Sequence, residues 1–170
     1  MVPRMPLTPA RPSALAWLGL VGLIVGCNAL GGASALVAGV ANTPAFYQAL
    51  VRPSWAPPPW LFGPAWTTLY TLMAIATWMV VRASPSPARR TALILFGTQL
   101  ALNLAWTPTF FGLKAIGASV VVIVANLLAV LATIVAYRRV RPVAGLLLVP
   151  LAGWVAFASA LNIAIWSLNR

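Results

Sequence analysis

The chain has 170 residues, of which 62% are hydrophobic and only 6% are charged. It carries 11 Lys and Arg residues but no Asp, Glu or His, so its formal net charge is +11. A soluble domain has about 25% charged residues, and a chain with so few would expose large apolar patches. The composition therefore excludes an ordinary soluble domain and indicates that the protein is folded in lipid.

The missing residue types exclude several kinds of chemistry. Without Asp, Glu or His there can be no carboxylate pair, Ser-His-Asp triad or Cys-His pair, so conventional catalysis is not expected. Zinc, haem and hard cations would lack their usual ligands, and we expect neither a metal nor a cofactor. The basic residues stand in short groups between apolar runs. Lipid headgroups or an anionic ligand, rather than nucleic acid, are therefore the expected partners.

Five apolar runs reach the length of about 20 residues that a helix needs to cross a bilayer. The breaks between them, such as 82–87 and 138–142, combine helix-stopping residues with positive charge. The sequence lacks the alternation of polar and apolar residues with a period of two that is typical of barrel strands. We predict an all-α integral membrane protein, a bundle of five transmembrane helices at about 14–40, 64–81, 91–111, 115–137 and 143–168.

Two segments lie outside the predicted spans. Residues 1–13 are rich in proline and are predicted to be disordered, ahead of a single domain over 14–170. Residues 41–63 are predicted to form a loop. Residues 1–35 also resemble a secretory signal, but their apolar run is longer than the ~7–15 residues of a signal core. A first spanning helix is the better interpretation.

The distribution of positive charge predicts the orientation in the membrane, because cytoplasmic loops carry more Lys and Arg. Three residues fall on the side of the first loop: Arg52, Lys114 and Arg170. The other 8 of the 11 fall on the side of the N-terminus: Arg4, Arg11, Arg82, Arg89, Arg90, Arg138, Arg139 and Arg141. The N-terminus should therefore be cytoplasmic, with the first loop and the C-terminus on the opposite side.

The loop 41–63 runs into a proline-rich tract. Five prolines within 53–64 restrict this tract to extended or polyproline-like conformations. Such stiffness suits a lid that holds one shape over a cavity. Trp55 and Trp60 in the same tract would also fit an aromatic belt at headgroup depth, and both interpretations stay open.

Polar amides occur inside the predicted spans, where they are costly unless they face the interior of the bundle. We expect inward positions for Asn28, Gln99, Asn103, Asn126 and Asn162. Each could simply form an interhelical hydrogen bond that holds the bundle together. Several, however, share a helix face with aromatic residues, an arrangement typical of flat, mostly apolar ligand sites. These faces hold Trp66 and Tyr70; Gln99, Asn103 and Trp106; and Trp154, Ala158, Leu161 and Asn162.

Three tracts resemble the tryptophan-rich sensory protein (TspO) family, which is related to the mitochondrial translocator protein, or peripheral benzodiazepine receptor. The first is RPSWAPPPWLFGPAWTTLY at 52–70, and the second is QLALNLAWTPTFFG at 99–112. The third is PLAGW at 150–154, continuing to Leu161 and Asn162. FYQAL at 46–50, before Arg52 and Pro53, also fits. The resemblance covers roughly 14–169, with matching order and spacing.

This resemblance implies five transmembrane helices, often in a dimer, and a pocket under the first loop that binds porphyrins such as protoporphyrin IX. The ligand-binding candidates are Trp55, Trp66, Tyr70, Asn103, Trp106, Trp154, Ala158 and Leu161, with Trp60, Phe62 and Asn162 as weaker candidates. Arg52, the one basic residue of the lid, is the candidate partner of a propionate, or else reaches headgroups. The cholesterol pattern needs a Tyr before a basic residue in 163–170, and its absence puts sterol binding in doubt.

Gly97, Ala101 and Ala105 are spaced by four residues and would let two helices approach closely. We predict a homodimer contact there, with packing inside one bundle as the alternative.

Three functions remain open for this chain. The first is a receptor, sensor or transporter of porphyrins or other flat hydrophobic ligands. The second is a protein that degrades porphyrin in light through an oxidisable Trp, and the third is a structural membrane protein without a ligand.

Overall fold

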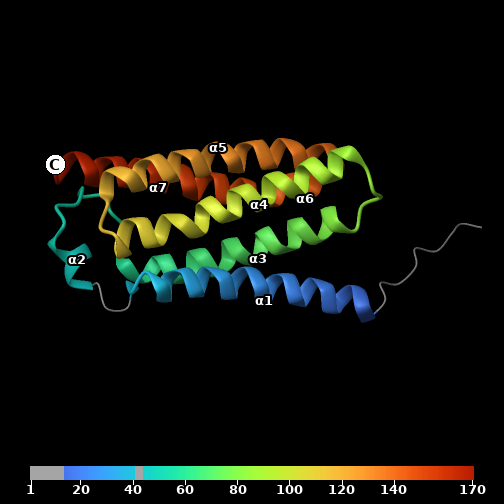
Figure 1. Ribbon diagram of the computed structural model, residues 1–170, viewed down its shortest axis with the longest axis horizontal. Coiled ribbons are helices and arrows are strands. Elements are labelled where there is room, and N and C mark those ends of the chain that lie inside the picture. The colour runs from blue at the N-terminus through green and yellow to red at the C-terminus, as the bar shows by residue number, and fades with distance from the viewer. Residues whose placement is uncertain (1–13, 41–43) are drawn as a thin grey trace, which may run out of the picture.

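The computed structural model describes residues 14–40 and 44–170 (Figure 1). The prediction of disorder for 1–13, and the first part of the predicted lid at 41–43, lie outside the described residues. The described part is helical and contains no strand. Its elements are α1 (Ala14–Val37), α2 (Pro44–Ala49), the 3₁₀ turn η2 (Pro59–Leu61), α3 (Phe62–Val81), α4 (Pro87–Thr107), the π-helical turn η3 (Pro108–Gly112), α5 (Ile116–Val140), α6 (Pro142–Leu147) and α7 (Val149–Leu168).

Within the described residues, four segments are long and apolar enough to cross a membrane. They are Trp17–Val37, Pro59–Val81, Ile116–Val140 and Pro142–Leu168. The predicted all-α membrane architecture is therefore confirmed, but four spans meet these criteria rather than five. The predicted third span corresponds to α4, which has 21 residues but is interrupted by polar and charged side chains.

The long helices lie side by side along one axis (Figure 1). α5 packs against both α4 and α7, whereas α3 packs against α1, α4 and α6. One end of the bundle carries α2, η3 and the C-terminus, and we call it the lid end. The opposite end carries the start of α1, the α3–α4 loop and α6, and we call it the arginine end.

The half of the bundle near the arginine end is packed solid. Met73, Ala74 and Val80 of α3 are fully buried, as are Val130 and Tyr137 of α5. The Tyr137 hydroxyl lies 2.9 Å from Thr77 Oγ1, so the two hydroxyls are hydrogen-bonded across the core. This solid half leaves the opposite half, beneath the lid, as the place where a cavity can form.

The predicted inward orientation of the amide side chains is confirmed. Gln99, Asn103, Asn126 and Asn162 are all buried. Asn28 is half-buried, and its Nδ2 donates to Thr71 Oγ1 of α3 at 3.3 Å. Hydrocarbon offers no hydrogen-bond partner, so these side chains turn toward the protein.

Helix ends differ from the predicted limits where backbone chemistry intervenes. α1 stops at Val37 rather than near residue 40, because Gly39 takes a left-handed conformation with φ 64° that ends the helix. α4 starts at Pro87, since Ser86 Oγ accepts a hydrogen bond from the Arg89 N–H at 3.1 Å as an N-cap. The predicted single helix over 143–168 is divided at Leu148. Pro150, two residues later, lacks the N–H that a continuous helix would use.

The end of α4 shows how a proline is accommodated at membrane depth. Pro108 has no N–H, so the carbonyl of Leu104 loses its helical partner. Ser34 Oγ of α1 donates to that carbonyl at 2.6 Å, and Thr109 Oγ1 donates to the Ala105 carbonyl at 2.7 Å. The Leu113 N–H then donates to the Pro108 carbonyl at 2.8 Å and closes the wide turn η3. The proline therefore widens the helix while the Leu104 carbonyl that it frees still has a partner.

The segment 41–63 is predicted to be a loop with an extended proline-rich part, but it is partly helical in the structure. The described part contains the short helix α2 and the turn η2. Between them the tract is non-helical, as predicted, and Pro58 has the polyproline-like angles φ −63° and ψ 143°. The added helix matters because α2 supplies side chains to the cavity described next.

Candidate functional site

A cavity of about 530 Å³ lies at the lid end, surrounded by α1, α2, α3, α4, η3 and α7. Sites for small molecules typically have about 300–1,000 Å³. Among the described residues, no charged side chain lines this cavity. Its aromatic lining consists of Tyr47, Phe62, Trp66, Tyr70, Trp106, Phe110 and Phe111.

The aromatic side chains lie in two neighbouring pairs on different helices. On α3, the Trp66 and Tyr70 ring centroids are 5.5 Å apart at an interplanar angle of 33°. At the α4–η3 junction, Trp106 and Phe110 stack with centroids 5.3 Å apart at 24°. The first pair is tilted, whereas the stacked pair Trp106–Phe110 presents a broad flat face. The cavity is therefore suited to a flat apolar ligand.

One buried amide in the cavity lining has a free donor. The Tyr70 hydroxyl donates to Asn103 Oδ1 at 2.8 Å, which fixes the orientation of the amide. Asn103 is only 4% exposed, and its Nδ2 has no hydrogen-bond partner in the described part of the chain. The Tyr47 hydroxyl is also buried without a described partner. A buried polar group left unpaired costs about 1–3 kcal/mol, so both groups would gain from a ligand that carries acceptors.

Asn162, a weaker ligand candidate, has a different environment although it lines the same cavity. Its Oδ1 accepts from Trp106 Nε1 at 2.8 Å and from Ser119 Oγ at 3.0 Å. These bonds join α7 to α4 and α5 and hold the indole of Trp106 in place. Asn162 is therefore positioned to orient Trp106 rather than to offer its oxygen to a ligand.

The approach of α1 to α3 depends on a glycine. A Cβ at Gly31 would overlap the Tyr70 ring, with Cζ at 2.7 Å. Gly31 and Gly32 both line the cavity. The absence of side chains lets α1 close the cavity while Tyr70 keeps its bond to Asn103.

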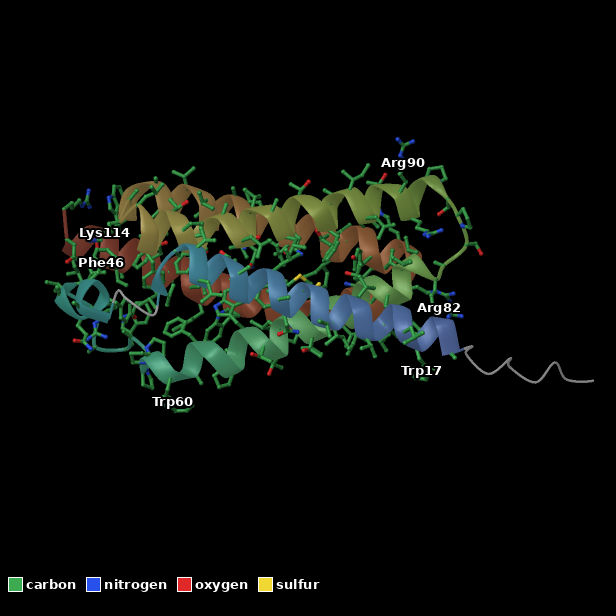
Figure 2. All side chains as sticks on the ribbon, turned by 60° about the horizontal axis from the view of Figure 1, so that its bottom comes forward. Trp17, Phe46, Trp60, Arg82, Arg90 and Lys114 are labelled. Atoms are coloured by element: carbon green, nitrogen blue, oxygen red, sulfur yellow. The ribbon has the colours of Figure 1, made fainter. Side chains whose placement is uncertain are left out.

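Eight of the twelve predicted ligand-binding residues line the cavity: Phe62, Trp66, Tyr70, Asn103, Trp106, Ala158, Leu161 and Asn162. Two others lie on the outside of the lid. Trp60 is 70% exposed at the surface (Figure 2). Trp55 is 49% exposed, with its ring 5.8 Å from that of Phe157. Both positions suit the aromatic-belt interpretation.

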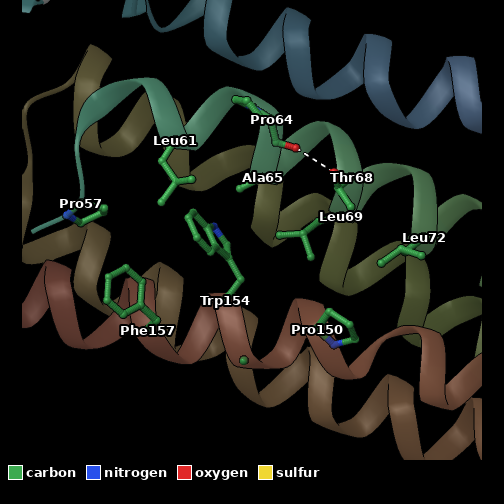
Figure 3. A pocket seen from close by; sticks show the side chains of 11 residues that line it. Pro57, Leu61, Pro64, Ala65, Thr68, Leu69, Leu72, Pro150, Trp154 and Phe157 are labelled. Carbon is green, nitrogen blue, oxygen red and sulfur yellow. Dashed lines mark hydrogen bonds between the residues drawn. The ribbon is translucent and has the colours of Figure 1, made fainter.

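Trp154 lies on a separate surface groove of about 580 Å³ between α3 and α7 (Figure 3). Its ring meets Phe62 and Trp66 edge to face, with centroids 5.9 and 6.5 Å apart. Phe62 and Trp66 line the cavity, whereas Trp154 does not. The groove and the cavity are thus separated by one aromatic layer, in which Trp154 supports Trp66 from behind.

Two cations lie on the aromatic side chains of α2. The Arg52 guanidinium is 4.9 Å from the centroid of the Tyr47 ring, and Lys114 Nζ is 5.7 Å from that of Phe46. Arg52 does not line the cavity, but Tyr47 does. Lys114 was not predicted from the sequence; the connection from η3 to α5 places it there with φ 54°. The neutral cavity therefore has positive charge close to its rim.

The structure adds other lining residues that the sequence analysis did not single out. Tyr47 belongs to α2, and Phe110 and Phe111 belong to η3. Phe110 and Phe111 lie in the tract 99–112 that carried the resemblance, which was the available signal. Tyr47 lies in FYQAL at 46–50, which also fits the resemblance, but the helix that presents it was not predicted.

The C-terminal end of α7 holds the lid in place. Asn169 Oδ1 accepts from the Val51 N–H at 3.0 Å, while its Nδ2 donates to the Val51 carbonyl at 2.9 Å. Nδ2 also donates to the Ile165 carbonyl at 2.7 Å. One side chain therefore fixes the lid backbone immediately before Arg52.

These observations define an integral, multi-pass, all-helical membrane protein with an aromatic cavity under a lid. The model of the TspO/MBR family matches residues 20–167, and the chain belongs to this family. The resemblance inferred from the three tracts is thereby confirmed.

Relatives come from bacteria, archaea and mammals. The chain is 42% identical to Protein CrtK of Rhodobacter capsulatus over 126 residues, which cover 74% of this chain and 79% of that protein. It is 44% identical to Tryptophan-rich protein TspO of Archaeoglobus fulgidus over 124 residues, covering 73% and 80%. It is 39% identical to the Translocator protein of Homo sapiens over 127 residues, covering 74% and 75%.

Replacing Asn169 by Ala should loosen the lid. The substitution removes both bonds to Val51, and each net hydrogen bond is worth about 0.5–1.5 kcal/mol. We expect the Val51 amide to exchange its hydrogen about tenfold faster, as measured by hydrogen–deuterium exchange. Ser167→Ala is the control, because Ser167 bonds only to its own helix, at the Ala164 carbonyl. Equal exchange in both variants would contradict the role of Asn169 in fixing the lid.

Proposed function

We propose that this protein binds a porphyrin such as protoporphyrin IX in the cavity, as a receptor, sensor or transporter. One observation carries the proposal. Seven aromatic side chains and two unpartnered polar groups line a single neutral cavity of about 530 Å³ in the lid half of the bundle. Buried polar groups are normally hydrogen-bonded, so two unpaired groups in the lining of one cavity favour a ligand over a purely structural role.

The proposed ligand matches the cavity in both shape and charge. The flat macrocycle would lie against Trp66 and Trp106. Asn103 Nδ2 and the Tyr47 hydroxyl would bond acceptors of the ligand. The propionates would point to the rim, where Arg52 and Lys114 supply positive charge, because carboxylates are costly inside a neutral cavity.

The names of the relatives indicate two roles. One is named Tryptophan-rich sensory protein, from Cereibacter sphaeroides, and others are named Translocator protein. Sensing and translocation both need a bound ligand. Light-dependent degradation of the porphyrin is the second candidate, since Trp66 places an oxidisable indole in the cavity lining.

Trp66→Ala should weaken the binding of protoporphyrin IX. By analogy with nucleobases stacked on aromatic side chains, the lost contact is worth about 1–3 kcal/mol, or roughly 5–150-fold in Kd. Titration of the purified protein, followed by quenching of tryptophan fluorescence, measures the affinity. Trp60→Ala is the matched control, because the same residue type is removed from the surface and the affinity should stay within about twofold.

Unchanged affinity in Trp66→Ala would remove the cavity as the porphyrin site. Illumination of the wild-type complex then separates the two candidate functions. A porphyrin spectrum that persists supports binding for sensing or transport. A spectrum that is lost in the wild type but persists in Trp66→Phe assigns the degradation to this cavity.

We also propose that α4 spans the membrane as the fifth helix, with the N-terminus of the chain in the cytoplasm. α4 runs alongside the other long helices from the arginine end to the lid end (Figure 1). The end with more arginine should face the cytoplasm. A bundle helix of 21 residues has about the length that a crossing needs.

Cysteine labelling tests both statements. Ser84 precedes α4 and Leu113 follows η3, and both are exposed. With Cys27 replaced by Ala, a membrane-impermeant maleimide added outside intact cells should label Leu113→Cys but not Ser84→Cys. Labelling of both from the same side would exclude a spanning α4, and the reverse pattern would exclude the proposed orientation.

The proposed homodimer contact lies on the outer face of α4. Gly97, Ala101 and Ala105 are exposed. A Cβ at Gly97 would meet no atom within 4 Å in the described part of the chain. This strip of small residues is free to receive a second helix at close range.

Ala101→Cys should therefore form a disulfide-linked dimer in the membrane under mild oxidation, detected by non-reducing electrophoresis. Val121→Cys is the control, since Val121 is 70% exposed on α5 but belongs to a bulky apolar face. Cross-linking of Ala101→Cys that does not exceed the control would reject this contact.

A further inference from the structure

Six arginines gather at the arginine end of the bundle. Arg82 follows α3, Arg89 and Arg90 lie in the first turn of α4, Arg138 and Arg139 end α5, and Arg141 precedes α6. Figure 2 shows Arg82 and Arg90 at this end and Lys114 at the other. The chain has no Asp or Glu, so no side-chain carboxylate of its own can neutralise this charge. An anionic partner must come from outside the chain.

Arg89 differs from its neighbours because it is half-buried. Its Nε is buried and has no hydrogen-bond partner among the described residues. Its backbone N–H donates to Ser86 Oγ at 3.1 Å, which fixes the residue in the first turn of α4. A guanidinium has five donors in a planar fork that matches carboxylate or phosphate. The half-buried fork of Arg89 therefore lacks the acceptor for which it is shaped.

The polarity of the helices concentrates positive potential at the same place. The first turn of a helix is the positive end of its dipole, where cations are unfavourable and anions are stabilised. Arg89 and Arg90 occupy that end of α4. Arg138 and Arg139 occupy the last turn of α5, whose dipole is favourable to them. The start of α4 is thus the least compensated positive region of this end.

Aromatic side chains show the depth of this region in the membrane. Trp17 and Trp78 stack with ring centroids 6.4 Å apart at 19°. The Arg82 guanidinium lies 5.2 Å from the centroid of the Trp78 ring. Tryptophan at the end of a span marks the level of the lipid headgroups. The arginines therefore lie where lipid phosphates are found.

A close helix contact also restrains one arginine of the group. A Cβ at Gly145 of α6 would overlap Cγ of Arg138 and lie 2.9 Å from the Ile134 carbonyl. The aliphatic stem of Arg138 therefore rests on the bare backbone of α6. This contact restrains the stem that carries the guanidinium, so less conformational entropy would be lost on binding.

We propose that the start of α4 binds the headgroup of an anionic glycerophospholipid, with the phosphate held by the fork of Arg89. The neighbouring arginines supply the field that attracts a net negative lipid in preference to a zwitterionic one. The site is separate from the porphyrin cavity, which lies at the opposite end, and does not depend on the function proposed for it.

Thermal unfolding of the full chain in lipid nanodiscs tests the proposal. In phosphatidylcholine discs, a minor fraction of phosphatidylglycerol should raise the Tm of the wild type by about 2–4 °C, because a ligand that binds the native state stabilises it. Arg89→Gln should lose most of this gain. Arg90→Gln removes the same charge from the neighbouring exposed position and should keep most of it.

Native mass spectrometry gives a second readout, in which the wild type can be tested on its own and against one variant. The wild type should retain phosphatidylglycerol in preference to phosphatidylcholine, and Arg89→Lys, which keeps the charge but not the fork, should retain less. Equal retention of the two lipids, or an equal loss of Tm gain in Arg89→Gln and Arg90→Gln, would overturn the site. Inorganic phosphate reproducing the Tm gain in phosphatidylcholine discs would overturn the lipid as its ligand.

Discussion

The structure depends on the fact that hydrocarbon cannot hydrogen-bond, so polar groups must find partners inside the protein. Ser34 meets this constraint where it pairs the carbonyl that Pro108 frees. Asn162 meets it where its oxygen accepts from both Trp106 and Ser119. These bonds connect α1, α4, α5 and α7 at the lid end, where the cavity lies. The same bonds that satisfy polar groups therefore join the helices that surround the cavity.

Against this background, the groups left unpaired stand out. Six buried side-chain atoms have no hydrogen-bond partner among the residues that the structure describes, and two of them, Asn103 Nδ2 and the Tyr47 hydroxyl, belong to residues that line the cavity. Gly31 lets α1 pass close to the ring of Tyr70, whose hydroxyl donates to Asn103. Hydrogen bonds within the protein thus fix the helices around the cavity, while two polar groups of the lining remain unpaired. Such groups can fix the orientation of a bound ligand.

Positive charge is handled differently at the two ends of the bundle. Near the lid, Arg52, Lys114 and Arg170 each lie over an aromatic ring, where cation–π attraction partly compensates them. At the arginine end, Arg82 has such a ring but the half-buried Arg89 has no described partner at Nε. A chain without carboxylates must take its counter-charges from the membrane or from a ligand. The proposed lipid site follows from this asymmetry.

The sequence by itself determined the membrane class, the family and the inward turn of the amides, because hydropathy and helical spacing are local properties. It could not tell Trp66 from Trp55, since both were equal ligand candidates in the tract 52–70 and only the fold turns one ring toward the cavity. Nor could it place Lys114 beside α2, or divide the last span at Leu148. Those outcomes required the tertiary structure, because spacing along a helix shows which residues share a face but not which neighbour that face meets.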